Sequence, residues 1–331
     1  MTEVDSVPSL AGLTCWTLTE GHAGMEVQTR ALAAALGLDA VVKRAPAPAA
    51  LGWLPAQFWP APLAIANARG ADLTPPWPDV LITCGRRSVA PALAVKRRHP
   101  ATFCIHIQNP RVALERFDAI VAPLHDGISG DNVVTCLGSI HGLTRPRLDA
   151  EAGVFRDRFA ALARPLVTVL VGGPNRAYGI GAAEIARLAD ALGDLAGRQT
   201  CGLAVVPSRR TGESNIAILR DRLSGTGAYV WDGVESNPYL ALIGLADALI
   251  VTCDSVNMVC EAAASERSVY VMMYPGKSAR FDAFHHAMRE RGHARAFEGG
   301  VDFSWRPVPL REINAAARAL APRILAARGT R

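Results

Sequence analysis

Polar residues follow an apolar run in the most informative stretch of this 331-residue chain, Ala248 to Tyr274. The run ends at Asp254 and Ser255, and the helix-like segment after them carries a single acid, Glu261. Asp254 or Ser255 can cap that helix, whose first N–H groups and positive dipole end then form an anion site. An ordinary capped helix with Glu261 in solvent is the alternative interpretation.

Other predicted strands of the second half also end in residues suited to phosphate. Glycines allow a ligand to approach the backbone closely, and adjacent arginines offer fork-shaped donors that match a diphosphate. A solvated turn is the alternative interpretation of the arginine pair. We therefore predict a nucleotide- and diphosphate-binding set: Gly172, Gly173, Asn175, Ser208, Arg209, Arg210, Asn237, Asp254, Ser255 and Glu261.

The first half has a parallel set of polar strand ends. Two arginines lie at the start of one predicted helix, where the helix dipole disfavours a cation by a few tenths to about 1 kcal/mol. Either a bound anion or solvent exposure of the arginines would offset this unfavourable energy. We predict an acceptor-side set: Gly21, Gly24, Gln28, Arg86, Arg87, Ser88 and Gln108. His125 beside Asp126 could act as or orient a general base, with His22 as a further candidate. A His-Asp dipeptide is, however, more often structural.

Metal and dinucleotide motifs are missing from the sequence. There is no HExxH, Walker loop, GxSxG or DxD pair, and Gly179 and Gly181 are followed by Glu184 where a dinucleotide fingerprint needs glycine. The seven cysteines include no CxxC pair, which favours buried reduced thiols over disulfides or zinc. We expect no metal and no cofactor.

Apolar segments alternate with helical patterns along both halves, which predicts parallel sheets buried on both faces. The fold class is therefore α/β, with two doubly wound, Rossmann-like domains facing across a cleft. We place the first, acceptor-side domain at residues 1–150 and the second, nucleotide-sugar domain at 151–309. A last helix is predicted within 310–331.

The net charge is +5, and residues 306–331 alone contain six arginines and one glutamate. Without a nucleic-acid motif we expect no nucleic acid; a phosphorylated small molecule, an acidic membrane surface or mere solubility fits better. The first residues, MTEVDSVPS, lack the apolar run of a secretory signal, and no apolar run is long enough to cross a bilayer. We expect a cytoplasmic protein, and peripheral contact with the inner membrane face through the arginine-rich segment remains open.

An ordered set of motifs resembles the plant mitochondrial-fission (elongated-mitochondria) proteins and their bacterial homologues, described as glycosyltransferases with the two-domain GT-B fold. One departure is Val27, where the family has asparagine. The likeness covers about residues 13–297. Its motifs are GHAGMEVQ (21–28), PPWPDVLITCGRRS (75–88), IQNPR (107–111), FDAIVAPLHD (117–126), LVGGPN (170–175), SRRT (208–211), NPY (237–239) and TCDSVNMVCEA (252–262).

The resemblance implies a metal-independent transferase that moves a hexosyl or N-acetylhexosaminyl group from a nucleotide sugar to an unidentified acceptor, with a membrane-associated acceptor as one alternative. A looser likeness to the peptidoglycan N-acetylglucosaminyltransferase implies that Glu261 holds the ribose and that the last helix crosses back onto the first domain. The plant relatives also imply a competing role, recruitment without catalysis. A sugar-nucleotide epimerase is rejected here, because no tyrosine has lysine four residues later and the dinucleotide fingerprint fails.

Overall fold

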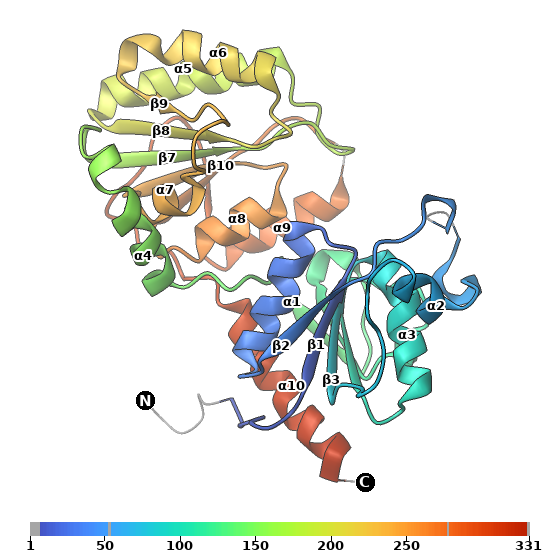
Figure 1. The fold of residues 1–331 in the computed structure, drawn as a ribbon. Helices are drawn as coiled ribbons and strands as arrows, with labels where there is room; N and C mark the ends of the chain where they lie inside the picture. The colour runs from blue at the N-terminus through green and yellow to red at the C-terminus, as the bar shows by residue number, and fades with distance from the viewer. Residues whose placement is uncertain (1–6, 52–53, 277, 330–331) are drawn as a thin grey trace. The chain divides into compact units, whose positions relative to one another are not determined.

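The computed structural model describes residues 7–51, 54–276 and 278–329. Residues 1–6, on which part of the prediction about a secretory signal rests, lie outside this range. The chain divides into two compact units, one of Met1–Gly142 with Arg311–Arg331 and one of Leu143–Leu310. Each unit is built on its own six-stranded parallel sheet (Figure 1).

The sheet of the first unit has the strand order β2-β1-β3-β4-β5-β6. One face packs against α1 and α10 through Leu32 and Leu320, and the other packs against α2 and α3 through Ala66 and Leu93. The strands are β1 (Cys15–Thr19), β2 (Ala40–Arg44), β3 (Val80–Cys84), β4 (Phe103–Ile107), β5 (Ala119–Pro123) and β6 (Val133–Cys136). The helices are α1 (Ala23–Ala35), α2 (Pro62–Asn67), α3 (Val89–Arg98) and α10 (Glu312–Gly329).

The sheet of the second unit has the order β12-β11-β10-β7-β8-β9, so β7 and β10 lie in its middle. Both strands are buried along their whole length, as expected for a parallel sheet covered on both faces. The strands are β7 (Leu166–Val171), β8 (Gly202–Pro207), β9 (Tyr229–Val230), β10 (Ala248–Thr252), β11 (Ser268–Met272) and β12 (Arg295–Ala296). The helices are α4 (Arg145–Phe155), α5 (Ala182–Gln199), α6 (Glu213–Leu223), α7 (Tyr239–Leu245), α8 (Val256–Ala263) and α9 (Ala279–Glu290).

The boundary between the units falls after Gly142, earlier than the sequence predicted. Helix α4 packs tightly on α7: a Cβ on Gly244 would lie 2.4 Å from the carbonyl oxygen of Leu148. Arg145 also donates to the carbonyl of Gly244 at 2.9 Å. Residues 143–150, predicted to lie in the first domain, therefore belong to the second unit.

The last helix, α10, packs on α1 and β6 within the first unit (Figure 1). Its apolar side is buried in the core, and two arginines of the basic segment are held by the unit itself. Arg328 lies 2.6 Å from the carboxylate of Asp79, and Arg323 donates to the carbonyl of Asp131 at 3.0 Å. These two arginines are thus partly committed to folding contacts rather than to an external surface.

The seven cysteines are all buried free thiols, which confirms the prediction from their spacing. Within the described ranges, no helix has the length and apolar character that crossing a membrane requires. The same residues contain no group of three or more His, Cys, Asp or Glu placed to hold a metal ion.

Candidate functional site

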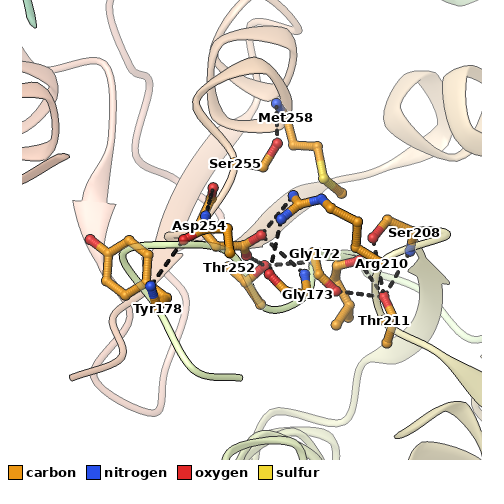
Figure 2. Close-up of polar contacts among 12 residues, drawn as sticks. Gly172, Gly173, Tyr178, Ser208, Arg210, Thr211, Thr252, Asp254, Ser255 and Met258 are labelled. Atoms are coloured by element: carbon orange, nitrogen blue, oxygen red, sulfur yellow. Dashed lines mark hydrogen bonds and ion pairs between the residues drawn. The ribbon is translucent and has the colours of Figure 1, made fainter. Parts of the chain in front are cut away.

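A buried carboxylate joins three loops at the carboxyl edge of the second sheet. The Asp254 side chain, just beyond β10, is 0% exposed. It accepts hydrogen bonds from the hydroxyl of Thr252 at 2.7 Å and from the N–H of Gly173 at 3.0 Å. Arg210, in the loop after β8, donates to it at 2.8 Å (Figure 2). The loops after β7, β8 and β10 are therefore tied to a single negative charge.

Glycine in the loop after β7 has a packing reason. A Cβ on Gly172 would lie 2.1 Å from a carboxylate oxygen of Asp254, and a Cβ on Gly173 would lie 2.2 Å from the carbonyl oxygen of Arg210. Both N–H groups have protein acceptors, since Gly172 donates to the Thr252 hydroxyl at 2.8 Å and Gly173 to Asp254. The sequence interpretation, close approach to a ligand, explains these glycines less directly than the contact between loops does.

Two threonines that complete this cluster were missed by sequence reasoning. Thr252 bridges Gly172 and Asp254, and the hydroxyl of Thr211 lies 2.5 Å from the carbonyl oxygen of Gly172 and 3.0 Å from that of Val171. Thr211 also accepts from the N–H of Ser208 at 3.0 Å. The sequence signal that could have identified them is a threonine at the end of a buried strand or in the turn after it. There a hydroxyl can form hydrogen bonds with backbone groups that have no partner in the sheet.

The two predicted arginines differ in their environment. Arg210 donates from one guanidinium nitrogen to Asp254 and from another to the carbonyl of Gly173 at 2.9 Å, although 43% of its side chain is exposed. Arg209 is exposed. Asn175 also serves the loop, donating to the carbonyl of Asp254 at 3.0 Å and accepting from the N–H of Ala177 at 2.7 Å. Arg209 is thus the more available cation of the pair.

Helix α8 begins directly after this cluster. The Ser255 hydroxyl accepts from the N–H of Met258 at 3.4 Å, which confirms Ser255 rather than Asp254 as the cap. By helix geometry, the N–H groups of Val256 and Asn257 have no intrahelical acceptor. Glu261 follows Ser255 by six residues, about 9 Å along the axis. One helix therefore presents backbone N–H groups at its first turn and, further along, a carboxylate.

Glu261 is paired with a tyrosine that the nucleotide-binding prediction did not include. The hydroxyl of Tyr239, at the start of α7, donates to Oε2 of Glu261 at 2.5 Å. Burial raises the pKa of Glu261 above its ordinary value, while the Tyr239 hydrogen bond and the charge of Arg147 act in the opposite direction. Asn237, another predicted residue, is exposed and accepts from the N–H of Tyr239 at 3.0 Å, which fixes the turn before α7.

A hollow of about 400 Å³ opens beside this cluster in the second unit. It is lined by Asn175, Arg176 and Ala177 from the loop after β7 and by Ser278 and Phe281 at the start of α9. Its volume lies within the range usual for small-molecule sites, roughly 300–1,000 Å³.

At the carboxyl edge of the first sheet, the ends of β1 and β3 are linked by Glu20. Its side chain is 9% exposed and lies 3.2 Å from Arg87 and 3.9 Å from His22, whose own side chain is 70% exposed. Arg86 sits beside Arg87 in the same short 3₁₀ turn. Ser88 is fully buried and donates to the carbonyls of Cys84 and Gly85. Ser88 therefore serves the turn itself.

The remaining predicted residues near α1 have different environments. Gly21 has a φ of +98°, a conformation that favours glycine, whereas a Cβ on Gly24 would meet nothing within 4 Å. Gln28, further along α1, is buried. Of the two glycines, only Gly21 has a backbone reason to be glycine.

A second group lies at the ends of β4 and β5. Asp126, in the 3₁₀ turn that also contains His125, accepts from the N–H of Asn109 at 3.1 Å. Gln108 has a φ of +78°, which a non-glycine side chain rarely adopts. Strands β1 and β5 are three positions apart, or about 14 Å at the usual strand spacing. His22 and Asp126 are thus alternative candidates for a base rather than partners in one.

Comparison with known proteins gives a family and a fold. The family model described as Mitochondrial fission ELM1 matches residues 23–324. The mitochondrial fission protein ELM1 of Arabidopsis thaliana is 31% identical over 280 residues, 76% of this chain and 65% of the plant protein. The uncharacterized protein RP120 of Rickettsia prowazekii (strain Madrid E) is 22% identical over 272 residues, 70% of this chain and 76% of that protein. The match therefore spans just under two thirds of the plant relative.

Similar solved structures include UDP-GlcNAc 2-epimerases and a MurG protein. The epimerase of Methanocaldococcus jannaschii is 12% identical with a TM-score of 0.58, covering 95% of this chain and 99% of that one. The Neisseria meningitidis epimerase, bound to UDP-GlcNAc, is 12% identical with a TM-score of 0.59, covering 95% and 100%. MurG of Acinetobacter baumannii is 15% identical with a TM-score of 0.50, covering 96% and 95%.

At these identities the likeness shows the fold, and it confirms the predicted α/β, GT-B-like class. It also corrects one sequence argument. A dinucleotide fingerprint and a Tyr-x-x-x-Lys pair were taken as necessary for a sugar-nucleotide epimerase. Because 2-epimerases share this architecture, the lack of those motifs no longer excludes one.

Proposed function

This chain belongs to the mitochondrial fission ELM1 family, and from that premise we propose that it transfers a sugar from a nucleotide-diphosphate donor to an acceptor hydroxyl. The observation that carries the proposal is helix α8, which begins at the carboxyl edge of a parallel sheet with Ser255 and carries Glu261 about 9 Å further on. Fold relatives bound to UDP-GlcNAc support a nucleotide sugar as the ligand.

The diphosphate would lie at the start of α8. The N–H groups of Val256 and Asn257 and the positive end of the helix dipole favour an anion there. Arg209 would add a mobile positive charge, which matters because negative charge grows on the leaving diphosphate during sugar transfer. Metal-independent transfer, as the sequence suggested, thus has a candidate source of positive charge within the chain.

The cluster around Asp254 would frame the site rather than touch the donor. Its hydrogen bonds to Gly173 and Arg210 hold the loops after β7 and β8 against the start of α8. The hollow lined by Asn175 and Phe281 is a candidate place for the sugar. Glu261 would hold the ribose, as the resemblance implied.

The acceptor would bind in the first unit, where Asp126, His125 or His22 would remove its proton. Asp126 is fixed by Asn109, while His22 is exposed beside Glu20. These two positions end different strands, so single substitutions separate them. Loss of turnover with unchanged donor affinity would identify the base among Asp126→Asn, His125→Asn and His22→Asn.

Isothermal calorimetry tests the donor site. Full-length protein is titrated with UDP, GDP and dTDP and with their sugar derivatives, alongside Glu261→Ala and the matched control Glu290→Ala. Glu290 is an exposed acid on α9 that pairs with His286. We expect wild type and Glu290→Ala to bind one ribonucleotide equally and Glu261→Ala to bind it at least about tenfold more weakly, as for one lost charged hydrogen bond. No nucleotide binding by wild type would overturn the proposal.

Recruitment without catalysis is the second candidate, and the name of the plant relative is what favours it. A recruiting protein needs a partner surface and no turnover. A stable partner captured equally by wild type and Glu261→Ala, with no release of nucleoside diphosphate in the presence of any donor, would favour this role. Incubation of wild type with UDP-GlcNAc also distinguishes transfer from epimerisation, because epimerisation changes the sugar and releases no diphosphate in net turnover.

A further inference from the structure

Helix α9 forms one wall of the hollow in the second unit, and a buried histidine ties it to the Asp254 cluster. Ser278 and Phe281, at the start of the helix, line the hollow. His285 lies one turn further along, is 2% exposed and stacks on the ring of Phe281 with 6.4 Å between centroids. Its Nε2 lies 2.8 Å from the carbonyl oxygen of Cys253, the residue before Asp254. One side chain therefore links the wall of the hollow to the cluster.

The partner of His285 fixes which ring nitrogen carries the proton. A carbonyl oxygen only accepts hydrogen bonds, so Nε2 of the neutral ring donates its hydrogen to Cys253. This carbonyl lies just past the end of β10, outside the paired part of the strand. Nδ1 is buried and has no hydrogen-bond partner among the residues that the structure describes. The bond from Nε2 therefore holds α9 against the end of β10.

The Asp254 cluster has bonds of its own that keep it in place without His285. Asp254 accepts from Thr252 at the end of its own strand and from Gly173 and Arg210 in the loops after β7 and β8. None of these three donors lies on α9. Loss of the His285 bond should therefore leave the start of α8 intact, where the diphosphate is proposed to lie.

The start of α9 is held from the other side by the loop after β7. Gly276, just before the helix, forms a bridge with Tyr178, and the ring of Tyr178 contacts Phe281 edge-on at 5.3 Å. Without the bond from His285, the helix could tilt about this contact and move Phe281. A displacement of about 1 Å is enough to weaken the recognition of a bound group strongly.

We propose that His285 is a positioning residue for the sugar half of the donor. By holding α9 to Cys253, it sets the distance between the hollow, where the sugar would lie, and the start of α8, where the diphosphate would lie. This inference rests on the proposed function and adds to it a residue that touches neither group. Affinity for a nucleotide sugar should then depend on His285, whereas affinity for the nucleoside diphosphate alone should not.

The experiment is calorimetry on full-length wild type, His285→Phe, His285→Gln and the matched control His286→Phe. His286 is the next residue of the same helix, and its exposed side chain pairs with Glu290. The ligands are UDP with UDP-GlcNAc, GDP with GDP-mannose and dTDP with dTDP-glucose, and the pair that wild type binds most tightly is used for the variants.

His285→Phe should bind the nucleotide sugar about fivefold or more weakly, as for loss of one coupling between two sites, and should bind the diphosphate as wild type does. His285→Gln should behave as wild type with both ligands, because its amide nitrogen can donate to the same carbonyl. His286→Phe should also match wild type.

Partial unfolding cannot imitate this result, because both ligands bind the folded state and would lose apparent affinity equally. Thermal unfolding of each variant checks the fold, and His285→Leu takes the place of His285→Phe if the latter does not fold. One measurement needs no variant: in wild type, hydrogen exchange across residues 279–290 should slow more with the nucleotide sugar than with the diphosphate.

The outcomes separate the two proposals. If wild type binds no nucleotide sugar, the proposed function fails, and this inference fails with it. If wild type binds one and the Phe or Leu variant binds it equally well, or weakens both ligands equally, the proposed function stands and the positioning role of His285 is wrong. Equal exchange across α9 with both ligands, or a His285→Gln variant as weak as His285→Phe, would likewise overturn the inference alone.

Discussion

The carboxyl edges of the two sheets are stabilised by different kinds of contact. In the second unit, Asp254 is 0% exposed and accepts hydrogen bonds from the loops after β7 and β8 and from Thr252 at the end of β10. In the first unit, Glu20 contacts a partly exposed arginine, and Asp126, itself partly exposed, accepts from the N–H of Asn109. The second edge is therefore held by a shared buried charge, and the first by separate and more exposed pairs.

This difference fits two kinds of ligand recognition. A rigid edge loses little freedom on binding, which suits a constant group such as a diphosphate. A less constrained edge suits an acceptor that must enter and leave. Substitutions at equivalent places in the two units test this contrast.

The largest effect is expected for Asp254→Ala. The change removes the acceptor of the buried Gly173 N–H and the counter-charge of Arg210, which together cost about 3 kcal/mol after allowing for the exposure of Arg210. Asp126→Ala in the first unit removes the acceptor of the Asn109 N–H at a partly exposed position and should cost less, about 1 kcal/mol. Urea unfolding, monitored by hydrogen exchange in peptides from each unit, measures the free energy of unfolding for both variants. Equal losses of stability would contradict the difference between the two sheet edges.

Gly173→Ala should cost about 2–3 kcal/mol, because its Cβ would lie 2.2 Å from a backbone oxygen that cannot move alone. Gly24→Ala in the first unit should instead stabilise by about 0.5–1 kcal/mol, since α1 leaves open space there and alanine is the better helix former. Thermal unfolding of the two variants gives the signs. A neutral Gly173→Ala would mean that the loop after β7 is looser than the cluster implies.

The sequence predicted the two sheets well because buried parallel strands are continuous apolar runs. The sequence also indicated helical patterns between the apolar segments, and helices such as Ala279–Glu290 lie there. The division after Gly142 was missed because α4 follows the first unit without a linker composition.

The side-chain pairs in the candidate site of the second unit could not be predicted from the sequence. Arg210 with Asp254, and Tyr239 with Glu261, join residues 44 and 22 positions apart, and no local pattern encodes such contacts. Sequence reasoning identified three of these four residues from their position at strand and helix ends. It could not tell which of Arg209 and Arg210 is committed to the protein.

Buried histidines should make both units less stable in acid. Burial lowers the pKa of His106 in the first unit to about 3 and lowers that of His285 in the second. The unfolded chain binds their protons below about pH 6.5, so His106 should cost about 1.4 kcal/mol per pH unit, or roughly 2 kcal/mol between pH 6.5 and 5, and His285 should act in the same direction. Urea midpoints at pH 7.5, 6.5, 5.5 and 5 should fall less steeply for His106→Gln and His285→Gln. Profiles parallel to wild type would contradict this.

The smallest expected effect on stability concerns the N-termini of α8 in the second unit and α1 in the first. Ser255 caps α8, whereas His22 occupies the N-cap position of α1 with extended backbone and no side-chain cap. His22→Ser should therefore stabilise the first unit by about 0.5–1 kcal/mol, because a serine hydroxyl can accept an N–H of the first turn. The same variant loses turnover if His22 is the base and keeps it if Asp126 or His125 is. Thermal unfolding and donor consumption on one protein preparation separate the two effects, and a destabilised His22→Ser would show that the Glu20 contact outweighs the cap.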